Sequence, residues 1–183
     1  MGTASGGVLI TGRGGSGKST AALACLGTGL RYAGDDYVLV RTSPSPHVYS
    51  LYSTAKIAAD NLDRFPHLAP IVSNAERLGS EKALFFFNEH RAAQLIEGFP
   101  IRAILIARVC GRRDTTVEPT TARVALKALT PTMEHMRGTR RQTLEKILRL
   151  VKSVPVYTLL AGTDLAQIPV TISGLLEKLE TSH

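Results

Sequence analysis

The chain has 183 residues, of which 44% are hydrophobic and 20% are charged, a composition typical of one globular domain with its own core. No apolar run approaches the roughly 18 residues of a membrane span, and the N-terminal segment has no basic stretch followed by a long apolar one. These features argue against a membrane-spanning or secreted protein, and we expect a cytoplasmic location without membrane binding.

The formal net charge of +7 indicates an anionic partner: a nucleic acid, a phosphorylated ligand or an acidic protein. Because aromatic residues make up 5% of the chain and Trp is absent, the sequence offers no platform of rings on which bases could stack. We therefore expect no sequence-specific binding to nucleic acid, and a basic surface that serves phosphate groups or an acidic partner.

The first part of the chain alternates between predicted strands and helices. The apolar stretch GVLIT predicts a buried strand over residues 7–11, and an Ala- and Leu-rich stretch predicts a helix over residues 19–26. Glycines directly after this stretch end the helix. Short apolar runs predict two more strands, over residues 30–33 and 37–41, and a loop over residues 42–47 follows.

The remaining chain continues this alternation. The strongest later strand, IRAILIARV, is expected over residues 101–109, and Thr139 and Gln142 have the spacing of a capping box. Strands that alternate with helices predict an α/β domain over residues 1–183, with a mixed, largely parallel sheet and flanking helices. The other elements expected are helices over residues 53–62, 84–97, 120–129, 139–151 and 170–179, and a strand over residues 154–160.

A glycine-rich loop carries the strongest functional signal. Residues 12–19 read GRGGSGKS and satisfy the pattern G-x-x-x-x-G-K-[ST], between a predicted strand and a predicted helix. The glycines let the backbone curl so that N–H groups point at phosphate oxygens. We expect Lys18 to neutralise the phosphates of ATP, and the hydroxyl of Ser19 to ligate Mg²⁺. The residues expected to bind ATP are Gly12, Arg13, Gly14, Gly15, Ser16, Gly17, Lys18, Ser19 and Thr20.

Asp35 and Asp36 are the candidates for the metal-binding and proton-accepting residues. A helix that starts near Lys18 climbs roughly 12–14 Å, and a strand over residues 30–33 returns a similar distance. If this strand is parallel to the first, it delivers both aspartates to the end of the sheet where the glycine loop lies. Two carboxylates there can divide the work between the metal and the proton of an attacking hydroxyl.

The run over residues 7–36, GVLITGRGGSGKSTAALACLGTGLRYAGDD, resembles the catalytic core of HPr kinase/phosphorylase and of HPr-kinase-like serine kinases, which share a fold with phosphoenolpyruvate carboxykinase. In that family an Asp-Asp pair follows the phosphate loop at the same spacing. The resemblance implies an ATP- and Mg²⁺-dependent serine kinase in which Asp36 accepts the proton and Asp35 is its partner. It also implies a phosphate contact for Arg102, a homo-oligomer, and an N-terminus that is short for the family.

The acceptor of the phosphate is left open by the sequence. A serine of a protein or peptide is expected first, and a small-molecule hydroxyl, such as that of free serine, is the alternative on the same scaffold. A third hypothesis is a nucleotide-binding regulatory module without activity. The joint presence of Lys18, Ser19, Asp35 and Asp36 disfavours it, because a decayed site is expected to lose at least one of them.

Further cationic residues are candidates for phosphate contacts. Lys56 and Lys82 could reach a phosphate, but lone lysines are more often solvated helix residues, and this is what we expect of them. Arg112 and Arg113 directly follow a predicted strand end, where a ligand can lie.

Overall fold

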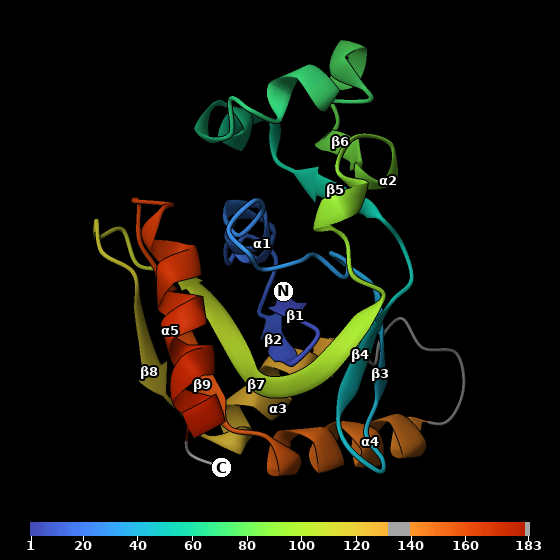
Figure 1. The fold of residues 1–183 in the computed structure, drawn as a ribbon, viewed down its shortest axis with the longest axis vertical. Coiled ribbons are helices and arrows are strands. Elements are labelled where there is room, and N and C mark those ends of the chain that lie inside the picture. The colour runs from blue at the N-terminus through green and yellow to red at the C-terminus, as the bar shows by residue number, and fades with distance from the viewer. Residues whose placement is uncertain (132–139, 182–183) are drawn as a thin grey trace.

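The computed structural model describes residues 1–131 and 140–181. A seven-stranded mixed sheet forms the centre of this part of the chain, and helices cover both of its faces (Figure 1). The strand order is β1–β2–β7–β4–β3. β9 also pairs with β7, and β8 pairs with β9. The strands are β1 (Gly2–Thr3), β2 (Gly6–Thr11), β3 (Val38–Arg41), β4 (His47–Ser50), β7 (Gly98–Val109), β8 (Thr116–Pro119) and β9 (Val156–Ala161).

The expected α/β class and mixed sheet are confirmed, but the sheet is only partly parallel. β2 and β9 lie parallel to β7, whereas the pairs β1–β2, β3–β4, β4–β7 and β8–β9 are antiparallel. The expectation of a largely parallel sheet was therefore wrong. It rested on the alternation of strands with helices, whereas β3–β4 and β8–β9 are antiparallel pairs without a helix between their strands.

The long strand β7 organises the sheet. One edge pairs with β2, with Val8 beside Ala103 and Thr11 beside Ile106. β4 pairs with the beginning of β7 and β9 with its end, and the bend that accommodates both partners is visible in Figure 1. Because β2, β7 and β9 are parallel, their C-terminal ends lie at one edge of the sheet. The glycine loop follows β2 at this edge.

Both faces of β7 are buried, which explains its continuous apolar sequence. Ala103 and Leu105 contribute to the core that includes α1 and α5, whereas Ile104 and Ile106 contribute to the core that includes α3 and α4. The helices are α1 (Lys18–Ala24), α3 (Ala122–Leu129), α4 (Arg140–Ser153) and α5 (Gln167–Thr181). None of the helices in the described ranges is long and apolar enough to cross a membrane.

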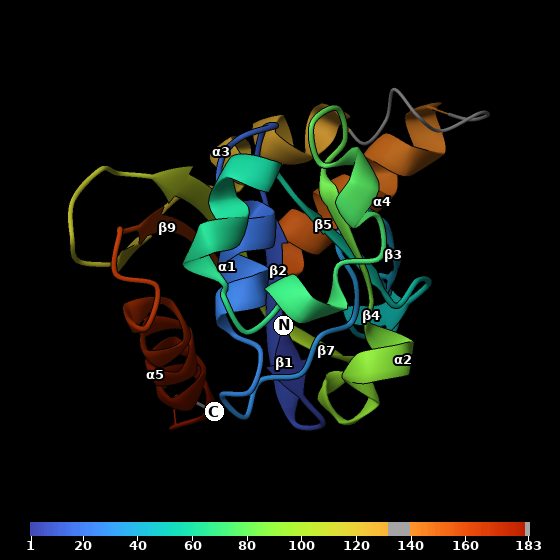
Figure 2. The same ribbon diagram turned by 90° about the horizontal axis from the view of Figure 1, so that it is seen from above.

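Residues 51–97 form a smaller unit, here called the β5–β6 unit, that lies over α1 (Figure 2). Its two-stranded antiparallel sheet pairs β5 (Thr54–Ile57) with β6 (Ala83–Phe86). Buried Phe65, Phe85 and Phe87 join it to the core that contains α1. Its short helices are η1 (Ala59–Arg64), η2 (Ala69–Ile71), η3 (Ala75–Arg77), α2 (Phe87–His90) and η4 (Ala92–Gln94).

The helices predicted over residues 53–62 and 84–97 were wrong. The first range holds β5 and most of η1, and the second holds the end of β6, α2 and η4. Ala and Leu in these ranges favour helix in isolation, but pairing between β5 and β6 overrode this local preference. The strand expected over residues 30–33 is reduced to single bridges of Arg31 with Gly2 and of Tyr32 with Leu95.

The remaining predicted elements are confirmed with shifted ends. These are the strands over residues 7–11, 37–41, 101–109 and 154–160, and the helices over residues 19–26, 120–129, 139–151 and 170–179. Thr139 of the predicted capping box lies outside the described residues. β4 and β8 were not predicted, because each is a short strand at a loop end without a long apolar run.

Replacing Leu105 by Ala should lower the free energy of unfolding by about 2–5 kcal/mol, because the side chain is fully buried and its loss leaves a cavity. Urea denaturation followed by circular dichroism measures this change. The matched control is Leu39→Ala on β3, where the side chain is 55% exposed and the expected change is about 0.5 kcal/mol or less. Equal losses in the two variants would contradict the burial of β7 on both faces.

Candidate functional site

The glycine loop connects the end of β2 directly to the start of α1. Gly17 caps α1 in the left-handed conformation, with φ of 92°, where a side chain would strain the backbone. Gly12 allows close packing, because a Cβ atom there would lie 2.5 Å from Oγ of Ser16. Residues 12–19 therefore have the strand–loop–helix context that the sequence pattern requires.

Two polar side chains of the loop are suited to a phosphate group. The ammonium of Lys18 folds back over the loop and donates to the carbonyl oxygens of Gly12 and Arg13, each at 3.0 Å. The hydroxyl oxygen of Ser16 is buried and has no hydrogen-bond partner in the described part of the chain. A buried hydroxyl without a partner is unfavourable, and a phosphate oxygen would accept its hydrogen bond.

The carboxylate of Asp35 is held by two hydrogen bonds from distant segments. The hydroxyl of Ser19 donates to Oδ1 at 2.9 Å, and the backbone N–H of Lys56 donates to Oδ2 at 3.1 Å. Burial raises the pKa of Asp35 above its usual range, although both hydrogen bonds and the nearby Lys18 act in the opposite direction. Asp35 is therefore a fixed and partly desolvated carboxyl group.

Ser19 and Asp35 fit a magnesium ion. Their oxygens lie 2.9 Å apart, and neighbouring ligands of an octahedral Mg²⁺ with metal–oxygen distances of about 2.1 Å are separated by about 3 Å. Within residues 1–131 and 140–181, no group of three or more His, Cys, Asp or Glu side chains could hold a metal by itself. The pair would therefore supply part of the coordination shell, with phosphate oxygens and water for the rest, as Mg²⁺ commonly has in proteins.

Asp36 differs from its neighbour because its side chain is exposed. No described residue donates a hydrogen bond to its carboxylate, so that group is free to interact with a ligand. Asp36 and Lys18 both line two cavities, which therefore meet at these residues.

The first of these, the loop cavity, has a volume of about 430 Å³ and lies between residues 14–20 and the β5–β6 unit. The second, the β2 cavity, has a volume of about 270 Å³ and is lined by residues 8–11 of β2, by Gly12 and by apolar side chains such as Val38 and Phe99. A group that is transferred from one cavity to the other would pass Lys18 and Asp36.

The aspartates reach this site by a different route from the one expected. Arg31 bridges antiparallel to Gly2, and Tyr32 bridges to Leu95, so no strand parallel to β2 carries the chain back. Backbone hydrogen bonds of Arg31 with Gly2 and of Tyr32 with Gln94 fix the return segment instead. The expected convergence of the aspartates with the loop is nevertheless found.

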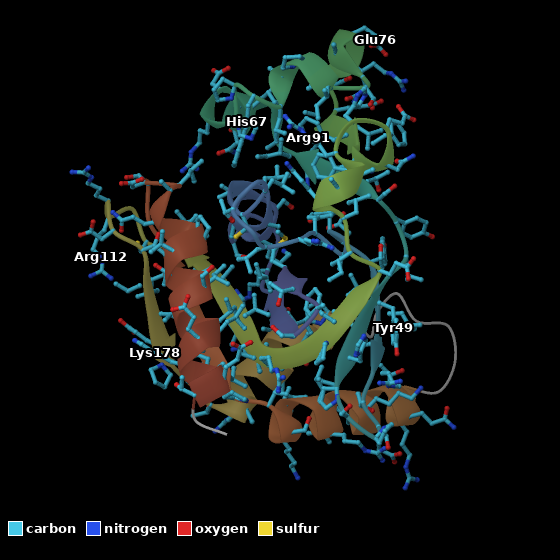
Figure 3. All side chains as sticks on the ribbon, in the orientation of Figure 1. Tyr49, His67, Glu76, Arg91, Arg112 and Lys178 are labelled. Carbon is cyan, nitrogen blue, oxygen red and sulfur yellow. The ribbon has the colours of Figure 1, made fainter. Side chains whose placement is uncertain are left out.

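The structure does not bring the other predicted arginines to the loop. Nε and Nη2 of Arg102 donate to the carbonyl oxygen of Ser5 at 3.1 and 2.9 Å, near the start of β2, whereas the loop follows its end. Arg112 extends outward from the connection between β7 and β8 (Figure 3). Arg113 lies 3.8 Å from a carboxylate oxygen of Asp164. None of the three lines the loop cavity.

Lys56 and Lys82, expected as solvated helix residues, line the loop cavity opposite the glycine loop. The sequence does contain a signal for this placement. In Ala55-Lys56-Ile57 the residues alternate between buried and exposed, the two-residue period of a strand.

No family model matches the sequence, and no curated protein matches it. Among solved structures, the HPr(Ser) kinase/phosphatase from Coxiella burnetii is similar to this chain, with a TM-score of 0.47 and 9% sequence identity. The alignment covers 97% of this chain and 91% of that chain. Similarity at this level does not assign catalytic or binding residues. The chemistry of the site therefore rests on the geometry described above.

Replacing Asp35 by Asn should raise the melting temperature of the ligand-free protein at pH 7. The raised pKa of Asp35 means that its contribution to stability is present when the carboxyl is protonated and is lost as the pH rises through the folded-state pKa. An amide removes this loss and keeps both contacts, since it can accept from Lys56 N–H and donate to the Ser19 hydroxyl. The gain should shrink as the pH falls toward the carboxyl range.

Differential scanning calorimetry of the two proteins between pH 4 and pH 8 measures this effect. Asp63→Asn, at an exposed position of η1, is the matched control and should show no such gain. A lower melting temperature of Asp35→Asn at pH 7 would contradict the burial cost assigned to Asp35.

Proposed function

We propose that the protein is an ATP- and Mg²⁺-dependent kinase that transfers the γ-phosphoryl group to a hydroxyl, first of all a serine of a protein or peptide. One observation carries this proposal: Lys18 and Asp36 line both the loop cavity and the β2 cavity. Phosphoryl transfer needs a cationic group at the transferred phosphate and a proton acceptor at the attacking hydroxyl, and Lys18 and Asp36 lie where the two cavities meet.

The loop residues have distinct roles in this proposal. Backbone N–H groups of residues 14–19 bind the nucleotide phosphates, and the ammonium of Lys18 leaves its carbonyl partners to neutralise them. Ser19 and Asp35 would hold Mg²⁺, which neutralises charge between the phosphates. Asp36 accepts the proton of the attacking hydroxyl, because its carboxylate is exposed and has no hydrogen-bond donor in the described chain.

A macromolecular acceptor is supported by the outer face of the β3–β4 hairpin. In this hairpin Val38 pairs with Ser50 and Leu39 with Tyr49, and Tyr37 and Leu51 directly flank the paired residues. The side chains of Tyr37, Leu39, Leu51 and Tyr52 are large, apolar and more than half exposed. Such a patch is typical of a surface that binds another protein, and it adjoins Asp36 through the small cavity that Tyr37 and Tyr52 share with it.

Replacing Lys18 by Ala should abolish the stabilisation of the protein by millimolar Mg·ATP, because ligand stabilisation follows occupancy of the site. The measurement is the shift in melting temperature on adding nucleotide, which corrects for any change in the ligand-free protein. Lys152→Ala, at an exposed position of α4, is the matched control and should keep the full shift. An undiminished shift in the Lys18→Ala variant would disprove the assignment of the nucleotide site.

Replacing Asp36 by Asn should slow phosphoryl transfer by about 10²–10⁴-fold, because an amide of similar size cannot accept the proton. Binding of Mg·ATP should stay close to that of the wild type, since the loop is unchanged. Transfer of labelled γ-phosphate to a library of serine peptides and to free serine measures the rate and separates the two acceptor classes. Asp63→Asn is the control, and transfer at the wild-type rate by Asp36→Asn would refute the base assignment.

A further inference from the structure

The loop cavity is lined by more cationic side chains than a nucleotide site of this kind requires. Lys18, Lys56, Arg64 and Lys82 line it, and Asp36 is the sole acidic residue among its described lining. The loop N–H groups and Lys18 already provide for the phosphates of a nucleotide. Lys56 and Lys82 come from the opposite wall, on the β5–β6 unit, and their role is not yet explained.

The pairing of β5 with β6 directs both lysines toward the cavity. Ala55, Ile57, Ala83 and Phe85 are buried on one face of this small sheet. Lys56 lies opposite Leu84, and Lys82 falls on the same face as Leu84 because side chains alternate with a period of two. Both lysines therefore lie on the face opposite this buried one, and both line the loop cavity.

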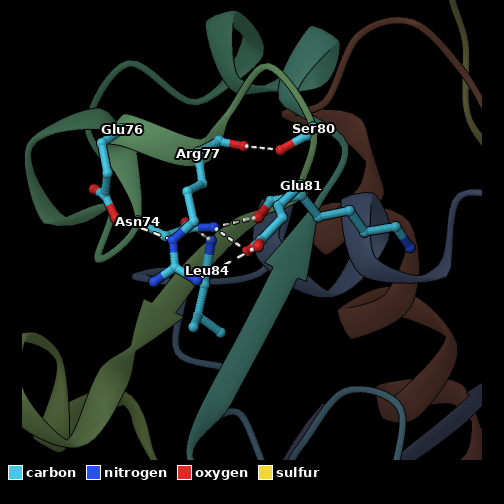
Figure 4. A network of polar contacts seen from close by, with 7 residues as sticks. Asn74, Glu76, Arg77, Ser80, Glu81 and Leu84 are labelled. Carbon is cyan, nitrogen blue, oxygen red and sulfur yellow. Dashed lines mark hydrogen bonds and ion pairs between the residues drawn. The ribbon is translucent and has the colours of Figure 1, made fainter.

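The backbone on both sides of the cavity wall is fixed by buried polar groups. The N–H of Lys56 is bonded to the carboxylate of Asp35, next to the proposed base. Asn74, which is 3% exposed, donates to the carbonyl of Lys82 at 3.0 Å and accepts from the N–H of Leu84 at 2.9 Å. Figure 4 shows the surrounding network, in which Glu81 is also held by Asn74 and Arg77.

Neither lysine has an acidic partner. No ion pair within the described chain involves Lys56 or Lys82, although the side chains of both are exposed. Like charges on one face of a sheet repel each other, and an anion bound between them in the cavity would relieve this repulsion. Arg64 is partly engaged, because its guanidinium donates to the carbonyl of Thr163 at 3.3 Å.

We propose that Lys56 and Lys82 bind an oxyanion group, a phosphate or a carboxylate, that belongs to the acceptor and lies near its reactive hydroxyl. The inference rests on the proposed function and adds the chemical class of the acceptor to it. Lysine ammonium groups act as compact point charges with three donors each, which suits an oxyanion without demanding one orientation. The backbone N–H of Lys56 donates to Asp35, and Lys56 and Asp36 line one small cavity. This subsite therefore lies beside Asp36, where the hydroxyl must lose its proton.

Thermal-shift titration with small oxyanions tests the subsite. The protein is first saturated with Mg²⁺ and the non-hydrolysable nucleotide AMP-PNP, so that the loop is occupied. Inorganic phosphate, acetate or chloride is then added at matched ionic strength.

Phosphate or acetate should give a further rise in melting temperature over chloride, and Lys56→Gln/Lys82→Gln should weaken this binding on the order of tenfold or more. The control Lys146→Gln/Lys152→Gln removes the same charge from α4 and should bind normally.

The outcomes separate this inference from the proposed function. A rise with phosphate or with acetate that is lost in the Lys56/Lys82 variant supports the subsite and identifies its oxyanion. If AMP-PNP stabilises the protein but neither oxyanion adds to it, the lysines serve the nucleotide and the subsite is disproved. A rise that persists in the double variant also disproves it. If AMP-PNP itself fails to stabilise the wild type, the proposed function fails before the oxyanions are added.

Discussion

The carboxylate of Asp35 is the contact on which the site depends. One of its oxygens accepts from Ser19 at the start of α1, and the other accepts from the N–H of Lys56 on β5. It thereby joins the glycine loop, the segment that returns from α1 and the β5–β6 unit, which are separate along the chain. Both hydrogen bonds end on one carboxylate group. They therefore fix the position of the glycine loop relative to the β5–β6 unit. The positions of Lys18, Asp36 and Lys56 follow from this constraint.

Adjacent residues of the same type acquire different chemistry here through burial. Asp35 is partly desolvated, which raises its pKa, and two accepted hydrogen bonds fix its orientation. Asp36 is exposed and lacks a donor in the described chain, so it can exchange a proton with a ligand. Groups whose environments differ in this way commonly divide the metal-binding and acid–base roles of an active site. A buried carboxyl lowers stability, which is the usual trade between stability and function.

Part of the positive charge of the chain gathers around the loop cavity. The glycine loop follows the C-terminal end of β2, and the β5–β6 unit forms a second cationic wall of the loop cavity. The hairpin of β3 and β4 adds an apolar outer face on the other side of Asp36. Three surfaces of different chemistry therefore meet at one pair of carboxylates, and this arrangement supports an acceptor that combines a hydroxyl, an oxyanion and an apolar surface.

The sequence by itself determined the features that depend on near neighbours. GRGGSGKS predicts a glycine loop between a strand and a helix, and the unbroken apolar run of β7 predicts a buried strand, because each property resides in a few consecutive residues. The convergence of Asp35 with the loop was also expected, although the expectation assumed a parallel strand where residues 31 and 32 make only single bridges. Only the tertiary structure decided that residues 53–62 and 84–97 contribute paired strands, that Lys56 and Lys82 face the loop, and that Arg102 binds Ser5 instead. These outcomes depend on hydrogen bonds and burial between segments far apart in the chain, and no local pattern encodes which distant partner a strand will find.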